Sequence, residues 1–250
     1  MKKAFRGVLG VTMVLGVGAC SSSNDLLPPI PEQAPSNPFF PHYHPVDTSN
    51  NLLTPPDGTP PTMVEGSTSI KADKRKAIED GYGMIGYSVF SITRVRPLDL
   101  SLLRQQAEYV GASLVIYYVA NEGSRTVYLP RPTRYNGIIP TPILVHDYEY
   151  GVSYWQKVRS YAFGAVFSDL TDQQRDMIGS NRGCAISVVV NGTPAFNSDF
   201  IAGDVLTVIN GQRMTNAKDC HQAIDALSGR TVEITYWRKG TKSTKTITLH

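Results

Sequence analysis

Few residues of this chain have the type and spacing that catalysis or metal binding requires. His42 and His44 stand two positions apart and could form half of a metal site, but no cluster of carboxylates or cysteines lies beside them. The run Gly179-Ser180-Asn181 is typical of a turn, and Asp57-Gly58-Thr59 lacks the Asp-Thr-Gly order of aspartic proteases. We therefore expect no catalytic residues, no metal and no cofactor.

The first twenty residues predict a secretory signal peptide. Basic residues at positions 2, 3 and 6 precede an apolar run over residues 7–17, which is too short to span a bilayer as a mature helix. The run ends in Leu15-Gly16-Val17-Gly18-Ala19-Cys20. This ending resembles the lipobox of bacterial lipoproteins, in which small residues precede a cysteine that is acylated and becomes the new N-terminus. The alternative is an ordinary signal peptide that happens to contain a cysteine.

The lipobox resemblance implies a membrane anchor at Cys20. One buried acyl chain binds a membrane only marginally, whereas the two or three chains of a bacterial lipoprotein anchor it stably, at about 0.8 kcal/mol per buried methylene. Ser21 stands where an aspartate would signal retention in the inner membrane. We therefore expect a palmitate-type anchor in the outer membrane, with the protein facing the periplasm and no transmembrane helix.

Cys184 and Cys220 are the two remaining cysteines. They lie 36 positions apart in a compartment that permits disulfides, but they have neither metal-ligand spacing nor a second pair that would indicate a disulfide framework. The pattern favours two buried free thiols, and a bridge between them stays open as the alternative.

Composition and charge indicate two small globular domains. The chain has 250 residues, of which 41% are hydrophobic and 18% charged, with a net charge of +3. That charge is too slight to indicate a nucleic-acid partner. Eleven of the 17 prolines fall between residues 21 and 69, which predicts a disordered, semi-extended tether over residues 20–69, able to reach roughly 150 Å from the membrane at about 3 Å per residue.

Residues 70–158 predict a small α/β sandwich. Ser69 or Asp73 can cap a helix that ends near Gly81, and Asp99 can start a second helix that stops at Gly111. Strands are predicted over residues 84–92, 114–120, 126–129 and 148–158, with a hairpin turn at residues 121–124 and a Pro-containing connector over residues 131–142. Residues 81–88 and 106–115 resemble a small α/β module of bacterial envelope lipoproteins, a resemblance that implies no known activity.

Residues 161–249 carry the strongest pattern after the lipobox. Gly203-Asp204 leads into an apolar strand, Asn210-Gly211 forms a hairpin, and an amphipathic helix and two further strands follow. These pieces, together with Gly192-Thr193-Pro194-Ala195, resemble the PDZ fold in the permuted strand order of bacterial envelope proteases. The overall class is then α+β, in which residues 159–250 form a five- to six-stranded, partly open β-barrel with two helices.

The PDZ resemblance implies a peptide-binding groove beside an open edge strand. An extended peptide or a protein C-terminus can add itself to such an edge as a further strand. The residues that the resemblance places in the groove are Phe163, Gly164, Ala165, Val166, Cys220, Ile224 and Leu227. Familiar members have a histidine where this chain has Cys220, and we expect His221, about 100° further round the helix, to be solvated.

The resemblance to bacterial proteases does not extend to their catalytic domain. Such a domain needs a Gly-Asn-Ser-Gly-Gly run, which is missing here, so the chain is not predicted to be an enzyme. We expect a membrane-anchored adaptor that binds C-termini or extended segments of periplasmic proteins. The alternatives are a structural lipoprotein whose PDZ domain packs without a ligand, and a protein that delivers clients to a separate protease.

Overall fold

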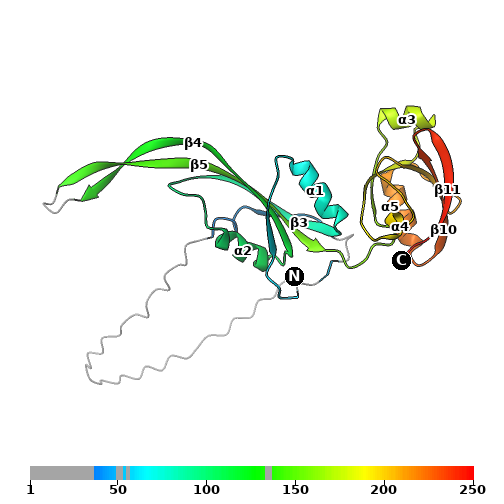
Figure 1. Ribbon diagram of the computed structural model, residues 1–250, viewed down its shortest axis with the longest axis horizontal. Helices are drawn as coiled ribbons and strands as arrows, with labels where there is room; N and C mark the ends of the chain where they lie inside the picture. Colours follow the sequence, from blue (N-terminus) through cyan, green and yellow to red (C-terminus); the bar gives the residue numbers. More distant parts are fainter. Residues whose placement is uncertain (1–36, 49–52, 55–56, 133–136) are drawn as a thin grey trace, which may run out of the picture. The chain divides into compact units, whose positions relative to one another are not determined.

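The computed structural model describes residues 37–48, 53–54, 57–132 and 137–250. The predicted signal peptide and Cys20 lie outside the described residues. The described part of the chain contains two β-sheets, each with its own helices (Figure 1). None of these helices is long and apolar enough to cross a membrane.

The first sheet has five strands in the order β1-β3-β5-β4-β2. Their bounds are β1 Tyr43–Pro45, β2 Thr62–Glu65, β3 Tyr82–Arg94, β4 Leu114–Pro132 and β5 Ile138–Lys157. β2 pairs with β4 in parallel, and the other neighbours are antiparallel. Strands β3, β4 and β5 form the centre of the sheet, and β1 and β2 form its edges.

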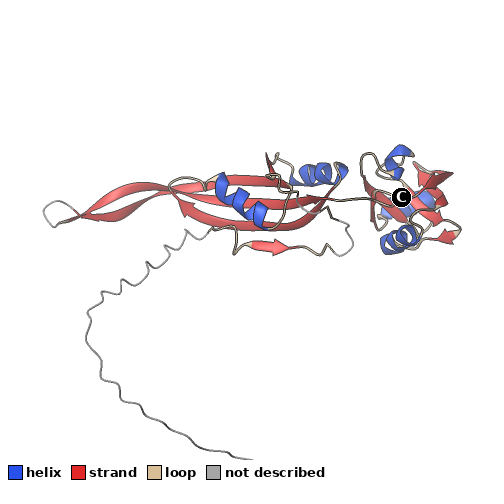
Figure 2. Cartoon of the chain, turned by 90° about the horizontal axis from the view of Figure 1, so that it is seen from below, coloured by secondary structure: helices blue, strands red, loops and turns tan. Residues whose placement is uncertain are grey.

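Two helices pack on this sheet, as the sequence predicts (Figure 2). α1 (Ile70–Glu79) begins after Ser69, whose side chain accepts a hydrogen bond from the Ala72 amide. α2 (Leu100–Tyr109) begins after Asp99, whose carboxylate accepts a hydrogen bond of 2.8 Å from the Ser101 amide. Each cap satisfies one of the amides that the first helical turn leaves without a partner.

The two helices cover opposite faces of the sheet. Ala77 of α1 packs with Ile116 and Trp155 of the sheet. The residues that precede these two in their strands, Val115 and Tyr154, instead pack with Leu103 and Ala107 of α2. Successive residues of a strand point to opposite faces, so these adjacent pairs lie on the two sides of the sheet. The expected α/β sandwich is therefore a three-layered domain with a core on each face.

The domain begins earlier in the chain than the sequence predicts. Residues 37–48 and 57–65, which we expected to belong to the disordered tether, supply β1, β2 and part of the core. Phe39 is 1% exposed, and its ring meets the rings of Phe90 and Tyr150 edge-on. Short edge strands tolerate proline and show little periodicity, which is why a proline-rich composition concealed them.

A second correction concerns the hairpin of β4 and β5. The expected turn at residues 121–124 is a shift of register between Asn121 and Gly123 inside a continuous strand pair, and the expected connector over residues 131–142 contributes to both strands. An extra residue in one strand produces such a β-bulge without ending the pairing. The two strands therefore run on together to Pro132 and Ile138.

The second sheet has the order β11-β10-β8-β7-β6, and β9 pairs with β8. Its elements, with three helices, are β6 Ala165–Ser168, α3 Asp172–Ile178, β7 Cys184–Val189, α4 Pro194–Asn197, β8 Val205–Ile209, β9 Gln212–Arg213, α5 Ala217–Ala226, β10 Thr231–Arg238 and β11 Thr241–Thr248. Asn210 and Gly211 both have positive φ, as the predicted hairpin between β8 and β9 requires. The larger hydrophobic core of this domain lies between the sheet and α5, and a smaller cluster of Leu170, Ile178, Ala185 and Val205 includes the end of α3.

The placement of β1, β2 and Phe39 predicts where the chain can be shortened. A chain that begins at Asn37 should unfold cooperatively with the stability of the full chain. One that begins at Ser69 loses two edge strands and a buried phenylalanine, whose removal alone costs about 3 to 5 kcal/mol. Thermal unfolding followed by circular dichroism measures both, and equal stability of the two truncated chains would show that residues 37–68 are not part of the domain.

Candidate functional site

Strand β6 is one of the two edge strands of the second sheet. Ala165, Val166, Phe167 and Ser168 pair with β7, and among the described residues no strand pairs with the other edge of β6. An unpaired edge presents backbone amides and carbonyls that can accept another strand. α5 packs against the sheet beside it, so the open edge and one side of α5 define the candidate site.

The loop before β6 is held by backbone hydrogen bonds. The Phe163 carbonyl accepts from the Ala195 amide, and the Gly164 carbonyl accepts from the Val190 amide, both at 2.8 Å. Thr193 supports the same loop, because its hydroxyl donates to the Val190 carbonyl at 2.6 Å. These bonds give the loop one conformation before any ligand arrives.

Gly164 has two reasons to be a glycine. Its φ is +85°, a backbone region that other residues rarely adopt, and a Cβ there would lie 2.1 Å from the Thr193 Oγ1 atom. Any larger residue would therefore force Thr193 or the loop to move. A substitution at Gly164 would disturb folding as well as binding, and it does not test the site cleanly.

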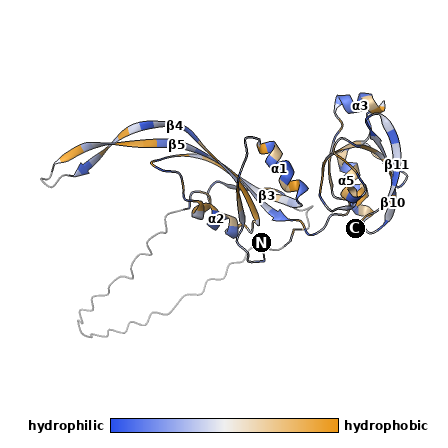
Figure 3. Cartoon of the chain, in the orientation of Figure 1, coloured by the Kyte–Doolittle hydropathy of each residue, from blue (hydrophilic) through white to orange (hydrophobic). Residues whose placement is uncertain are grey.

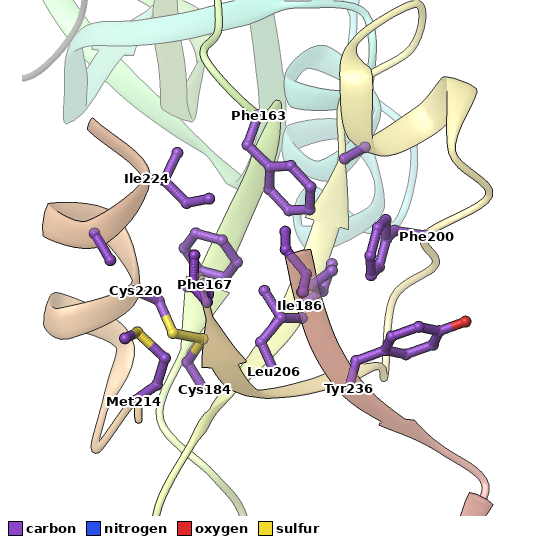
Figure 4. Packing of buried hydrophobic residues seen from close by; sticks show 14 of the residues in the cluster. Phe163, Phe167, Cys184, Ile186, Phe200, Leu206, Met214, Cys220, Ile224 and Tyr236 are labelled. Atoms are coloured by element: carbon purple, nitrogen blue, oxygen red, sulfur yellow. A yellow bond between two sulfur atoms is a disulfide. The ribbon is translucent and has the colours of Figure 1, made fainter. Parts of the chain in front are cut away.

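Cys184 and Cys220 form a disulfide, so the expectation of two free thiols is wrong. Cys184 lies in β7 and Cys220 in α5, with their Cα atoms 6.5 Å apart. Both side chains are fully buried in the core of the second sheet (Figure 4). A separation of 36 positions in the sequence could not show this proximity, because it arises only when α5 packs on the sheet.

The disulfide also changes the assignment of the helix side of the site. Because the Cys220 sulfur points into the core toward β7, Cys220 does not line the open edge as the PDZ resemblance implied. The ring of His221 instead meets the ring of Phe167 edge-on, with the centroids 5.0 Å apart. His221 is exposed, as we expected, and it is also a residue of α5 that contacts strand β6.

The environment of His221 favours the neutral form of its imidazole. Burial lowers the pKa of His221 below the ordinary value of 6.5, and the nearby carboxylate of Asp225 opposes this shift only in part. A neutral imidazole has one N–H donor and one acceptor nitrogen, so it can exchange hydrogen bonds with a polar side chain of a ligand. The PDZ resemblance placed Cys220 in the groove, and only the packing of α5 shows that the His221 ring lies against Phe167.

The structure brings four of the other predicted residues together. Phe163 and Ile224 are buried in the same cluster as Phe167 (Figure 4). Ala165 and Leu227 are partly buried against this cluster. The Phe163 and Phe167 rings lie parallel, with centroids 5.9 Å apart. Val166 is half-buried outside this cluster, because neighbouring residues of a strand face opposite sides.

The burial of Ile224 limits what it can contribute to a site. It is only 4% exposed and belongs to the core, so replacing it with a charged residue would unfold the domain rather than fill a pocket. Leu227, at the end of α5, is the partly exposed apolar residue of the helix side. Leu227 and His221 are therefore the two helix-side residues that can be changed with least effect on the core.

Comparison with known proteins identifies the domain that carries the site. Residues 162–249 match the family model of the PDZ domain. This region, about a third of the chain, is thus a PDZ domain, as its motifs predict, and PDZ domains are non-catalytic binding domains. The comparison of the whole sequence with curated proteins gives no match.

The comparison with solved structures finds proteins of the HtrA type. The HtrA3 PDZ domain bound to a phage-derived ligand (FGRWV) is 16% identical, with 35% of this chain and 83% of that chain covered and a TM-score of 0.31. The HtrA-type protease AlgW with a decapeptide is 14% identical, with 50% and 41% covered and a TM-score of 0.29. This chain thus covers less than half of the AlgW chain.

The Cys184–Cys220 disulfide should contribute measurably to stability. Closing a loop of 36 positions removes about 4 kcal/mol of chain entropy from the unfolded state in the loop-closure account. The double substitution of Cys184→Ser and Cys220→Ser should therefore lower the free energy of unfolding by about 2 to 4 kcal/mol, measured by urea denaturation. The oxidised chain should show no free thiol at these positions, and a thiol titration that finds two would contradict the bridge.

Proposed function

We propose that this chain is a peptide-binding adaptor, whose PDZ domain takes a C-terminus or an extended segment of another protein as an additional strand on β6. The observation that carries the proposal is the unpaired edge of β6, which lies beside α5 in a domain whose family is shown. Main-chain hydrogen bonds along β6 would supply most of the affinity, and neighbouring side chains would supply the preference for particular ligands.

Three parts of the site would divide the recognition of a ligand. Backbone amides after Gly164 would hold a terminal carboxylate, since the loop is already fixed by the bonds to Ala195 and Val190. The apolar surface near Phe163 and Leu227 would receive the last side chain. His221, against Phe167, would face a residue further back along the ligand.

The proposal includes an anchor in the bacterial envelope. Its support is the short apolar run that ends in a small-small-Cys sequence at Cys20, together with the position of Ser21. An acylated Cys20 would hold the protein on the outer membrane, and the PDZ domain would act on proteins of the periplasm. The disulfide between Cys184 and Cys220 agrees with an oxidising compartment.

Peptide titration tests the binding site. A peptide with a free C-terminus that binds the chain should bind at least tenfold more weakly when amidated, because a charge-assisted hydrogen bond contributes roughly 1.5 to 3 kcal/mol. Leu227→Lys and His221→Ala should each weaken binding with little change in thermal stability, and His146→Ala, outside the PDZ domain, serves as the matched control. Isothermal titration of a C-terminal peptide library measures all of these. A ligand that is indifferent to amidation and to both substitutions binds elsewhere.

Acylation of Cys20 is tested separately in bacterial cells. The natural chain should incorporate labelled palmitate and partition into the detergent phase, and Cys20→Ala should do neither. A chain with Cys20→Ala that still takes up palmitate and still partitions into detergent would show that the anchor lies elsewhere.

A further inference from the structure

The outer part of the β4–β5 hairpin is a ribbon of only two strands. β3 pairs with β5 as far as His146, so residues 125–132 and 138–145 pair with each other and with no further strand of the described chain. We call these two segments the ribbon (Figure 1). A two-stranded hairpin is at best marginally stable in water by itself, because it has no sheet or helix on which to bury its side chains.

The ribbon exposes large apolar side chains on both of its faces. Residues that lie opposite each other share a face, so Leu129 and Ile139 lie on one face and Tyr128 and Ile138 on the other. The exposed large apolar residues, with exposed fractions between 48% and 71%, are Tyr128, Leu129, Ile138, Ile139 and Leu144. Figure 3 shows the beginning of β5 in orange and the end of β4 in blue. A strand pair that borders water on one face usually alternates apolar and polar residues, and the ribbon does not.

Four prolines restrict what can cover the ribbon. Pro130 lies opposite Pro140, and neither residue has an N–H. The two prolines therefore form a non-hydrogen-bonded pair, in which the backbone groups of both residues point away from the partner strand. Tyr128–Pro142 and Pro132–Ile138, two positions away on either side, have the same orientation. Four of the six outward-facing residues therefore have no amide donor. An added strand would find few donors there, which argues against pairing with a second β-edge, and the same lack of donors lowers the cost of leaving water.

The charge of the ribbon favours an anionic surface. Residues 123–146 contain no aspartate or glutamate. Arg125 forms an ion pair with Asp147 at 2.8 Å, whereas Arg131, at the apolar end, has no ion-pair partner among the described residues. A long arginine side chain beside exposed isoleucines can keep its charge at a phosphate group while its stem lies in an apolar layer.

We propose that the ribbon inserts its apolar end into the interface of a lipid bilayer that contains anionic lipids. A bilayer interface surrounds an inserted segment, which suits apolar side chains on both faces, whereas a flat protein surface would cover only one. Interfacial segments bury their apolar groups about 5 to 10 Å deep. Among the described residues, Ile138 and Ile139 then lie deepest, and Arg131, which lies opposite Ile139, extends its side chain to the phosphates. Leu129 and Tyr128 lie nearer the headgroups. This contact is independent of both Cys20 and the peptide site.

A local fluorescence reporter tests the insertion. The full chain carries Cys20→Ala, so that no acyl chain contributes, together with Ile139→Cys labelled with an environment-sensitive dye. The Cys184–Cys220 disulfide leaves no other free thiol. Vesicles of phosphatidylcholine and phosphatidylglycerol in equal parts should shift the emission to the blue, and phosphatidylcholine alone should do so far less. The same dye on Asp176→Cys, in α3 of the PDZ domain, should not respond to either.

Substitutions in the ribbon separate the apolar and the charged contributions. Ile138→Asn should weaken vesicle binding at least tenfold, since burying an isoleucine contributes about 1.5 to 3 kcal/mol, and Ile201→Asn, at an isoleucine of the PDZ domain that is 46% exposed, should not. Arg131→Glu changes the charge by two units and should weaken vesicle binding roughly thirtyfold, at about 1 kcal/mol per charge near an anionic surface. Unchanged circular dichroism confirms that each variant is folded.

Three results would overturn the proposal. The first is no emission shift at position 139, or an equal shift at position 176. The second is an equal emission shift with vesicles of phosphatidylcholine alone, which would show that insertion does not require anionic lipids. The third is a shift that grows with protein concentration in the absence of vesicles, which would show that a second copy of the chain covers the ribbon.

Discussion

The disulfide between Cys184 and Cys220 is the constraint on which the candidate site depends. It joins α5 to β7, the strand that pairs with the ligand-side strand β6, and it determines which side of α5 faces the core. With Cys220 turned inward, the next residue, His221, reaches Phe167. A helix held only by Ala223 and Ile224 could still roll on its apolar contacts, because hydrophobic packing has little directional preference. The covalent bond removes that freedom.

The two sheets differ in how their edges are built. In the first sheet β1 and β2 are short, and the prolines of the ribbon remove donors from its outer edges, so these edges are poor templates for another strand. In the second sheet the edge strands β6 and β11 keep their amides, because neither of these described strands contains a proline. Of these two edges, β6 is the one beside α5, so a strand added there would place its side chains near the helix.

The proposed membrane contact and the proposed peptide site belong to different sheets. The ribbon continues β4 and β5, whose inner halves are held on both faces by α1 and α2, so its base is rigid even though its end is a two-stranded hairpin. The peptide site is positioned by the backbone bonds of Phe163 and Gly164 and by α5. Neither site shares a residue with the other, so a variant of one leaves the other intact.

Local patterns determined much of this protein. The caps at Ser69 and Asp99, the hairpin at Asn210-Gly211 and the PDZ motifs around Gly203-Asp204 follow from short-range backbone chemistry, which neighbouring residues decide. Only the tertiary structure decided that Phe39 and the proline-rich residues before position 70 complete the first sheet. A short edge strand can be identified only from the strand with which it pairs, because its own composition has no distinctive pattern. The side of α5 that carries Cys220 was assigned to the groove from the resemblance, and the tertiary structure corrects it for a similar reason. Residues 220 and 221 differ by about 100° on a helix, and the bond to Cys184, a residue distant in sequence, selects which of them faces the core.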